Sequence, residues 1–158
     1  MPLNLSQVLW KQIKAQAEAG YPSECCGLGL SSRQDPDTIS EIFPCRNVQD
    51  EFHRLDPQVY PRTSRTAYII DPKALLVVHR KVQEESLLIR LIYHSHMDAP
   101  ADFSEEDKRL ALQDGNPVYP SASYLIVPVH YQKAAEPLLY TWDPSQKAFC
   151  PDKPAINQ

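Results

Sequence analysis

Two histidines separated by one residue provide the first chemistry in this sequence. His94 and His96 follow an apolar run, residues 87–93, whose length and lack of a helical stripe predict a buried β-strand interrupted only by Arg90. Side chains two positions apart on a strand point to the same face. The two imidazoles can therefore bind one metal ion.

A carboxylate follows at the start of a predicted helix. Ser104 is a favourable N-cap residue, and Asp107 lies three positions later. This helix start folds Asp107 back toward the end of the strand, which predicts a His94, His96 and Asp107 ligand set with one position open. The Ser104 and Asp107 pair is also explained as a helix cap worth about 0.5–2 kcal/mol, and both interpretations can hold together.

Two imidazoles and one carboxylate form the ligand set of a catalytic zinc site, because a structural site closes all four positions. In the best such sites zinc lowers the pKa of a bound water to roughly 7. Asp98 and Asp102 lie nearby in the sequence and are alternative carboxylate ligands. A single histidine is more often a hydrogen-bonded residue of the core or surface, so the metal interpretation depends on the whole pattern.

The full spacing resembles the signature of the JAMM (MPN+) zinc metalloprotease family. That signature is His-x-His, seven residues, Ser, two residues and Asp, and His94, His96, Ser104 and Asp107 fall on its positions. The family also has an upstream glutamate in a context such as Pro-x-Glu-Cys-Cys-Gly, and Glu24 lies in the segment Pro-Ser-Glu-Cys-Cys-Gly. Because the two segments match independently, the resemblance is more specific than a lone histidine pair.

This resemblance implies a role for each motif residue. Zinc (Zn2+) would be bound by His94, His96 and Asp107, and Glu24 would act first as general base and then as general acid. The hydroxyl of Ser104 would donate to the developing oxyanion. Together these roles imply a peptide or isopeptide hydrolase.

The resemblance also implies a substrate for this chain. It is similar to the short prokaryotic family members, which resemble enzymes that cleave after the C-terminal Gly-Gly of a ubiquitin-like sulfur-carrier protein, for example releasing cysteine from a carrier adduct. The alternatives are a ubiquitin-type isopeptidase and a non-catalytic MPN scaffold that binds partners, although such scaffolds typically lack a ligand. Met97 stands where many members have proline, and we expect it to affect substrate choice more than catalysis.

The elements around the motifs predict an α/β fold. We expect helices at residues 5–19, 72–85 and 104–114, and strands at residues 25–30, 38–43, 67–70, 87–96, 124–130 and 138–142. Gly27 and Gly29 predict a bulge or a close backbone approach, and Pro128 predicts an edge strand or a bulge. Residues 44–66 have no clear period and form either a functional loop or a surface excursion.

This order predicts one α/β domain over residues 1–142, with a mixed central β-sheet flanked by helices. The resemblance implies the MPN fold, which is similar to the cytidine deaminase architecture. Residues 143–158 are rich in proline, and we expect them to form a loose C-terminal tail.

Composition excludes some classes of function. The 158 residues include 16 basic and 20 acidic residues, a net charge of -4, without a basic stripe, which argues against a nucleic-acid partner. The sequence shows neither a signal peptide nor an apolar run of membrane-spanning length, so we expect a cytoplasmic protein and no membrane partner. The four cysteines form no C-x-x-C pairs, and we expect reduced thiols.

Overall fold

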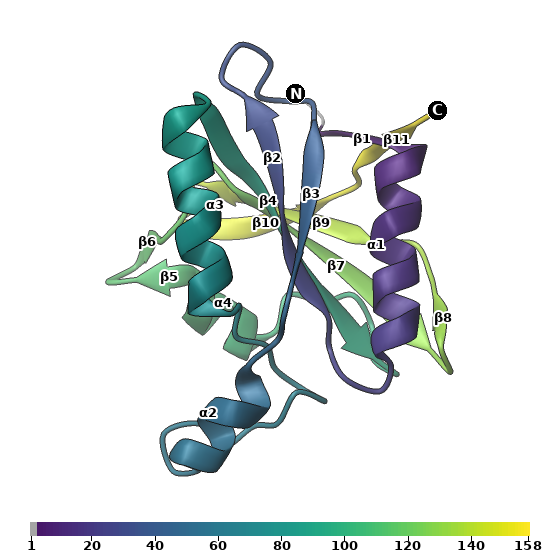
Figure 1. The fold of residues 1–158 in the computed structure, drawn as a ribbon, viewed down its shortest axis with the longest axis vertical. Helices are drawn as coiled ribbons and strands as arrows, with labels where there is room; N and C mark the ends of the chain where they lie inside the picture. Colours follow the sequence, from purple (N-terminus) through teal and green to yellow (C-terminus); the bar gives the residue numbers. More distant parts are fainter. Residues whose placement is uncertain (1–2) are drawn as a thin grey trace.

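The computed structural model, which describes residues 3–158, is built around a seven-stranded mixed sheet (Figure 1). The strands follow the order β10-β9-β7-β4-β2-β3, and β8 pairs beside β7. Their bounds are β2 Cys26–Ser32, β3 Glu41–Cys45, β4 Leu87–Met97, β7 Ser123–His130, β8 Lys133–Ala134, β9 Leu138–Asp143 and β10 Ala148–Asp152. The central strands β4 and β7 run parallel, and their neighbours pair antiparallel.

Helices cover both faces of this sheet (Figure 1). Helix α1 (Gln7–Gly20) packs on one face, and α3 (Pro72–Glu84) and α4 (Glu105–Ala111) pack on the other. Helix α2 (Gln49–Leu55) lies beyond one end of the sheet. None of the helices between residues 3 and 158 is long and apolar enough to cross a membrane.

Four short strands complete the chain. Strands β5 (Leu112–Gln113) and β6 (Asn116–Pro117) form a small hairpin, whose turn contains Gly115 with a φ of 78°. Strand β1 (Asn4–Ser6) pairs in parallel with β11 (Ala155–Asn157), so the two ends of the described chain meet.

Strand β4 divides its side chains between the two cores. Leu91 and Tyr93 belong to the core beneath α1, whereas Ile92 belongs to the core beneath α3 and α4. Because side chains alternate along a strand, His94 and His96 continue the face of Ile92. Both histidines therefore point toward the layer that contains α4.

The structure confirms the mixed α/β sheet, the strand that ends in the two histidines and the helix that follows Asp71. The Asp71 carboxylate accepts from the backbone N–H of Lys73 at 3.0 Å, as an N-cap does. The predicted helix over 5–19 begins two residues later, because Ser6 caps it and residues 4–6 pair as β1.

The glycines of β2 have the two predicted consequences. The register between β2 and β4 shifts between Gly29 and Leu30, as a bulge would produce. At Gly27 the close approach comes from the ring of Tyr93, since a Cβ there would collide with the phenol oxygen. Gly27 therefore makes room for the ring of Tyr93 from β4.

Several predicted boundaries are wrong. Residues 44–66 include α2, and residues 67–70 form no strand, although Ile70 makes one isolated bridge with Asn47. The predicted strand over 38–43 is displaced to β3, and α4 ends at Ala111, three residues early, because the chain turns into the β5–β6 hairpin.

The predictions for Pro128 and for the C-terminal segment are also wrong. Pro128 lies in the sheet interior, at the point where β7 changes partner from β9 to β8, so its missing N–H interrupts neither ladder. Residues 143–158 are not loose, because β10 extends the main sheet beside β9 and β11 pairs with β1.

Candidate metal centre

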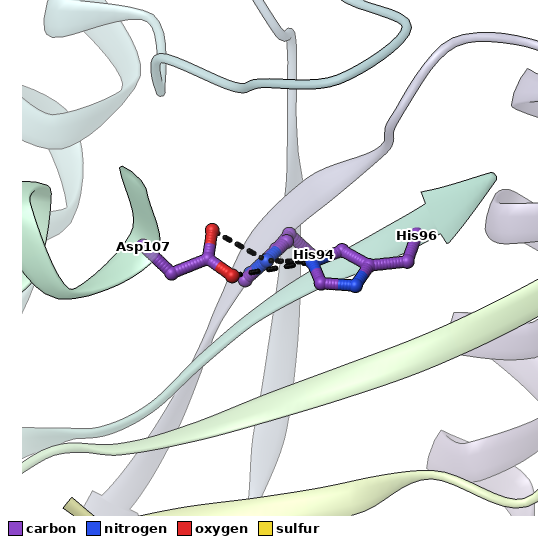
Figure 2. Close-up of side chains that lie close together, drawn as sticks. All are labelled: His94, His96 and Asp107. Atoms are coloured by element: carbon purple, nitrogen blue, oxygen red, sulfur yellow. Dashed lines mark hydrogen bonds and ion pairs between the residues drawn. The ribbon is translucent and has the colours of Figure 1, made fainter. Parts of the chain in front are cut away.

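The end of β4 brings two imidazoles together on one face of the sheet. The Nε2 atoms of His94 and His96 lie 3.2 Å apart, and both side chains are buried. Figure 2 shows the carboxylate of Asp107 reaching them from α4. Its Oδ1 lies 3.1 Å from Nε2 of His94, and its Oδ2 lies 3.2 Å from Nε2 of His96.

The N-terminus of α4 fixes the direction of that carboxylate. Oγ of Ser104 accepts from the backbone N–H of Asp107 at 3.1 Å, and Oδ2 of Asp107 accepts from the backbone N–H of Ser104 at 3.0 Å. These reciprocal bonds form a capping box. The cap and the convergence of Asp107 on the histidines are therefore present together, as the sequence suggested.

The three side chains fit the donor set of one cation. Zinc–nitrogen bonds of about 2.0–2.1 Å in a tetrahedral site place two ligand atoms about 3.3 Å apart, close to the spacings of 3.1–3.2 Å found among these atoms. His94, His96 and Asp107 are the group of possible metal ligands within residues 3–158 whose donor atoms converge.

Neighbouring groups orient the two rings differently. Nδ1 of His96 lies 2.8 Å from the carbonyl oxygen of Pro100, so an N–H there leaves Nε2 free to accept. His94 is held by the ring of Tyr68, which stacks on it at a centroid distance of 4.3 Å. Nδ1 of His94 has no hydrogen-bond partner in the described part of the chain.

The charges at the centre are strongly coupled. Burial disfavours the charged form of Asp107, but the adjacent imidazoles of His94 and His96 outweigh it and hold the pKa of this carboxyl well below its usual range. Burial likewise opposes a charge on His96, whereas its bonds with Asp107 and the carbonyl of Pro100 raise its pKa to about 9. Burial lowers the pKa of His94. Asp107 is thus ionised, as a ligand must be, and a cation would displace a proton from His96.

Glu24 lies beside this centre because β2 pairs with β4. The registers place Cys26 opposite His94, and Ser95 bonds with Cys25 through both its backbone and its hydroxyl. Because the two strands are antiparallel, Glu24, which precedes Cys25, comes alongside His96, which follows Ser95. Glu24 and His96 line one pocket. Its side chain is buried, and Oε1 lacks a hydrogen-bond partner within residues 3–158. Burial raises the pKa of Glu24 to about 8.

The segment around α2 holds Glu24 in place. The backbone N–H of Glu24 donates to the carbonyl of Ser64 at 2.7 Å, and its carbonyl accepts from the side-chain amide of Asn47 at 2.9 Å. The same amide also donates to the carbonyl of Ala67 at 3.1 Å. The sequence alone did not indicate a role for Asn47 or Tyr68, because neither stands in a local pattern that indicates such contacts.

The alternative carboxylates lie outside the centre. Asp98 accepts from the hydroxyl of Tyr21 and the backbone N–H of Tyr131, which turns it away. Asp102 is largely exposed, and its nearest approach is 3.8 Å to Nδ1 of His96, the nitrogen bonded to Pro100.

A pocket of about 200 Å³ opens beside the centre. It is lined by Glu24, Arg62, Arg65, Thr66, His96, Met97, Ala99, Asp102 and Ser104. A larger cavity of about 600 Å³ lies between α1 and the C-terminal segment, bordered by residues such as Trp10 and Lys153, but it contains none of the predicted site residues. All five predicted residues, by contrast, belong to the centre or its pocket.

Comparison with known proteins relates this arrangement to a family. Residues 6–142 match the family described as prokaryotic homologs of the JAB domain (Prok-JAB). No curated protein matches the chain.

Solved structures share the fold at low identity. A solution structure from Desulfitobacterium hafniense is 23% identical, with a TM-score of 0.72 over 99% of this chain and 93% of that one. A solution structure from Salinibacter ruber is 22% identical, with a TM-score of 0.63 over 98% and 90%. A JAB1/MPN domain protein from Archaeoglobus fulgidus is 15% identical, with a TM-score of 0.51 over 98% of both chains.

Proposed function

Because the chain belongs to the Prok-JAB family of prokaryotic JAB domains, we propose that it is a zinc-dependent peptidase acting at the C-terminal Gly-Gly of a ubiquitin-like sulfur carrier. The observation that carries this proposal is the convergence of His94, His96 and Asp107 beside the buried carboxyl of Glu24. Zinc held by these three side chains would activate water and polarise the scissile carbonyl.

Glu24 supplies the proton transfers. Its carboxyl borders the same pocket as His96 and has an oxygen without a partner in residues 3–158, so it is free to accept a proton from the attacking water. Burial raises the pKa of Glu24 to about 8, which is near the pH at which a group can both take a proton and return it to the leaving amine.

Ser104 and the pocket act on the rest of the substrate. Because Oγ of Ser104 accepts from the backbone of Asp107, its own hydrogen is available for the carbonyl oxygen of the scissile bond. The pocket, about 200 Å³ in volume, suits a narrow Gly-Gly segment, since glycine has no side chain to hold its backbone away.

The four free thiols further support a cytoplasmic location.

The alternatives differ in what they require of the chain. A ubiquitin-type isopeptidase would use the segment over residues 44–66 to hold its substrate, and Arg62 and Arg65 of this segment do line the pocket. A non-catalytic scaffold has no need of a complete ligand set, which this chain keeps.

Zinc analysis combined with mass spectrometry of candidate carriers tests the proposal. We expect protein purified without added zinc to contain about one zinc ion per chain and to shorten a carrier extended beyond Gly-Gly. Asp107→Ala should lose both the metal and the cleavage. Stoichiometric zinc without cleavage of any such extension would contradict the substrate, and preferential cleavage of a lysine-linked conjugate would favour the isopeptidase.

A further inference from the structure

Two arginines line the candidate pocket without acidic partners. Arg62 and Arg65 border it together with Glu24, His96 and Ser104. Both are exposed, and within residues 3–158 neither forms an ion pair, as is also true of Arg33, Arg54 and Arg80 outside the pocket. The one side-chain hydrogen bond of the pair joins Arg62 to the carbonyl of Thr66 at 3.3 Å.

The backbone that carries these arginines is anchored to the site. Between them lies Ser64, which is buried and whose carbonyl accepts from the backbone N–H of Glu24 at 2.7 Å. The carboxylate of Asp50 accepts from the backbone N–H and from the hydroxyl of Ser64, at 2.8 Å each. The two arginines thus extend from a backbone that is anchored next to Glu24, and both line the pocket.

On the basis of the function proposed above, we infer that Arg62 and Arg65 bind the α-carboxylate of the residue released from the substrate. A guanidinium group matches a carboxylate with two parallel N–H donors, which makes arginine the suitable residue for this contact. This contact makes the enzyme selective for a linear extension of one residue after Gly-Gly.

The size of such an extension agrees with the position of the arginines. The carboxylate of a one-residue extension lies about 4 Å beyond the scissile bond, so its binding group must belong to the same pocket as Glu24 and His96. A lysine-linked conjugate presents no carboxylate there, because its leaving amine ends a long aliphatic side chain. The acidic groups of the pocket are Glu24 and the exposed Asp102.

Arg62 also acts on the candidate base, and the test must separate the two effects. Burial raises the pKa of Glu24 to about 8, and Arg62 is one of the positive groups that oppose this rise. Removing Arg62 will therefore alter proton transfer for every substrate. A ratio between two substrates that differ only at the terminal carboxylate cancels that common effect.

The experiment compares carriers that end in Gly-Gly-Cys, prepared either as the free acid or as the C-terminal amide. We expect the zinc-loaded protein to have a kcat/KM about 10- to 100-fold higher for the acid. Replacing both Arg62→Ala and Arg65→Ala should bring the ratio close to one, and the paired lysine replacements should retain part of it. Arg54→Ala, which removes the same charge from α2 outside the pocket, should leave the ratio unchanged.

Each outcome has a distinct meaning. Equal cleavage of acid and amide by the unmodified protein overturns the inference and leaves the proposed peptidase intact. A preference for the acid that survives the double replacement overturns the assignment to these arginines. If neither carrier is cleaved by zinc-loaded protein, the proposed function is wrong and the inference falls with it.

Discussion

Glu24 is a carboxyl group that the fold buries without a hydrogen-bond partner for Oε1 among the described residues. Burial raises its pKa from 4.5 to about 8. Between these values the folded protein holds a proton that the unfolded chain has released, so the contribution of Glu24 to stability becomes less favourable as the pH rises from about 4.5 to about 8. A group placed this way costs stability and is more easily explained by chemistry than by packing.

Glu24→Gln should therefore have opposite effects on activity and stability. We expect kcat to fall about 10²- to 10⁴-fold with the zinc content unchanged, because the residue transfers protons and is not a ligand. In chelator-treated protein the variant should be about 1–3 kcal/mol more stable at pH 8, a gain that disappears near pH 4.5. Urea unfolding at both pH values, with exposed Glu84→Gln as control, measures it. An equal gain at both pH values would refute this account of Glu24.

At the residue scale the sequence predicted that His94, His96 and Asp107 converge, but it did not predict the residues that support them. The spacing of His94 and His96 is informative because the strand repeat is local. Tyr68 and Asn47, in contrast, act through contacts with distant segments, the stacking on His94 and the bonds to Glu24 and Ala67. No local pattern encodes such contacts, and the resemblance motifs do not include these residues.

At the scale of elements, the N-terminal cap of α4 also positions the carboxylate of Asp107. The two bonds between Ser104 and Asp107 satisfy the helix start and aim the carboxylate at the imidazoles. If the hydroxyl of Ser104 also donates to the substrate, the cap and the catalytic contribution can be separated by substitution.

We expect Ser104→Ala to lose about 1 kcal/mol of unfolding free energy and about 10²- to 10³-fold in kcat, while zinc content stays stoichiometric. Ser104→Asp restores an acceptor at the cap but lacks a hydroxyl donor, so its stability should approach that of the unmodified protein while kcat remains low. Thermal unfolding and steady-state cleavage rates measure the two effects. Recovery of kcat in Ser104→Asp would mean that Ser104 acts only through the helix.

The elements themselves were predictable where their signals are local. The helix after Asp71 has both a cap and a proline at its first position, and β4 begins with an apolar run whose length and lack of a helical stripe indicate a strand. Helix α2 has a single buried residue, Gln49, so the apolar stripe that would announce it is absent. The prediction for Pro128 was wrong because a missing N–H weakens a sheet only where the neighbouring strand would accept a hydrogen bond from it. The sequence does not show which strands pair with β7 at this position.

At the scale of the whole molecule, the C-terminal segment belongs to the fold that supports the site. The turn after β9 had a readable signal, since the carboxylate of Asp143 accepts from the backbone N–H groups of Ser145 and Gln146. The pairing of β11 with β1 joins the two ends of the described chain and is invisible to any local pattern.

Phe149 of β10 tests this view, because its ring packs at centroid distances of 4.8 Å from Phe103, 5.5 Å from Tyr124 and 5.1 Å from Trp142. Phe103 directly precedes Ser104, so the cluster also supports the start of α4. Phe149→Ala should cost about 2–3 kcal/mol, somewhat below the loss for a fully buried phenylalanine, since the ring is only partly buried.

Urea unfolding followed by circular dichroism measures this loss, and Tyr131→Ala, which removes an aromatic side chain that is 86% exposed, should change stability by less than about 0.5 kcal/mol. A loss for Phe149→Ala as small as that of the control would mean that the last strand is peripheral. A large loss accompanied by weaker zinc binding would instead show that the segment after β9 stabilises the helix from which Asp107 reaches the two histidines.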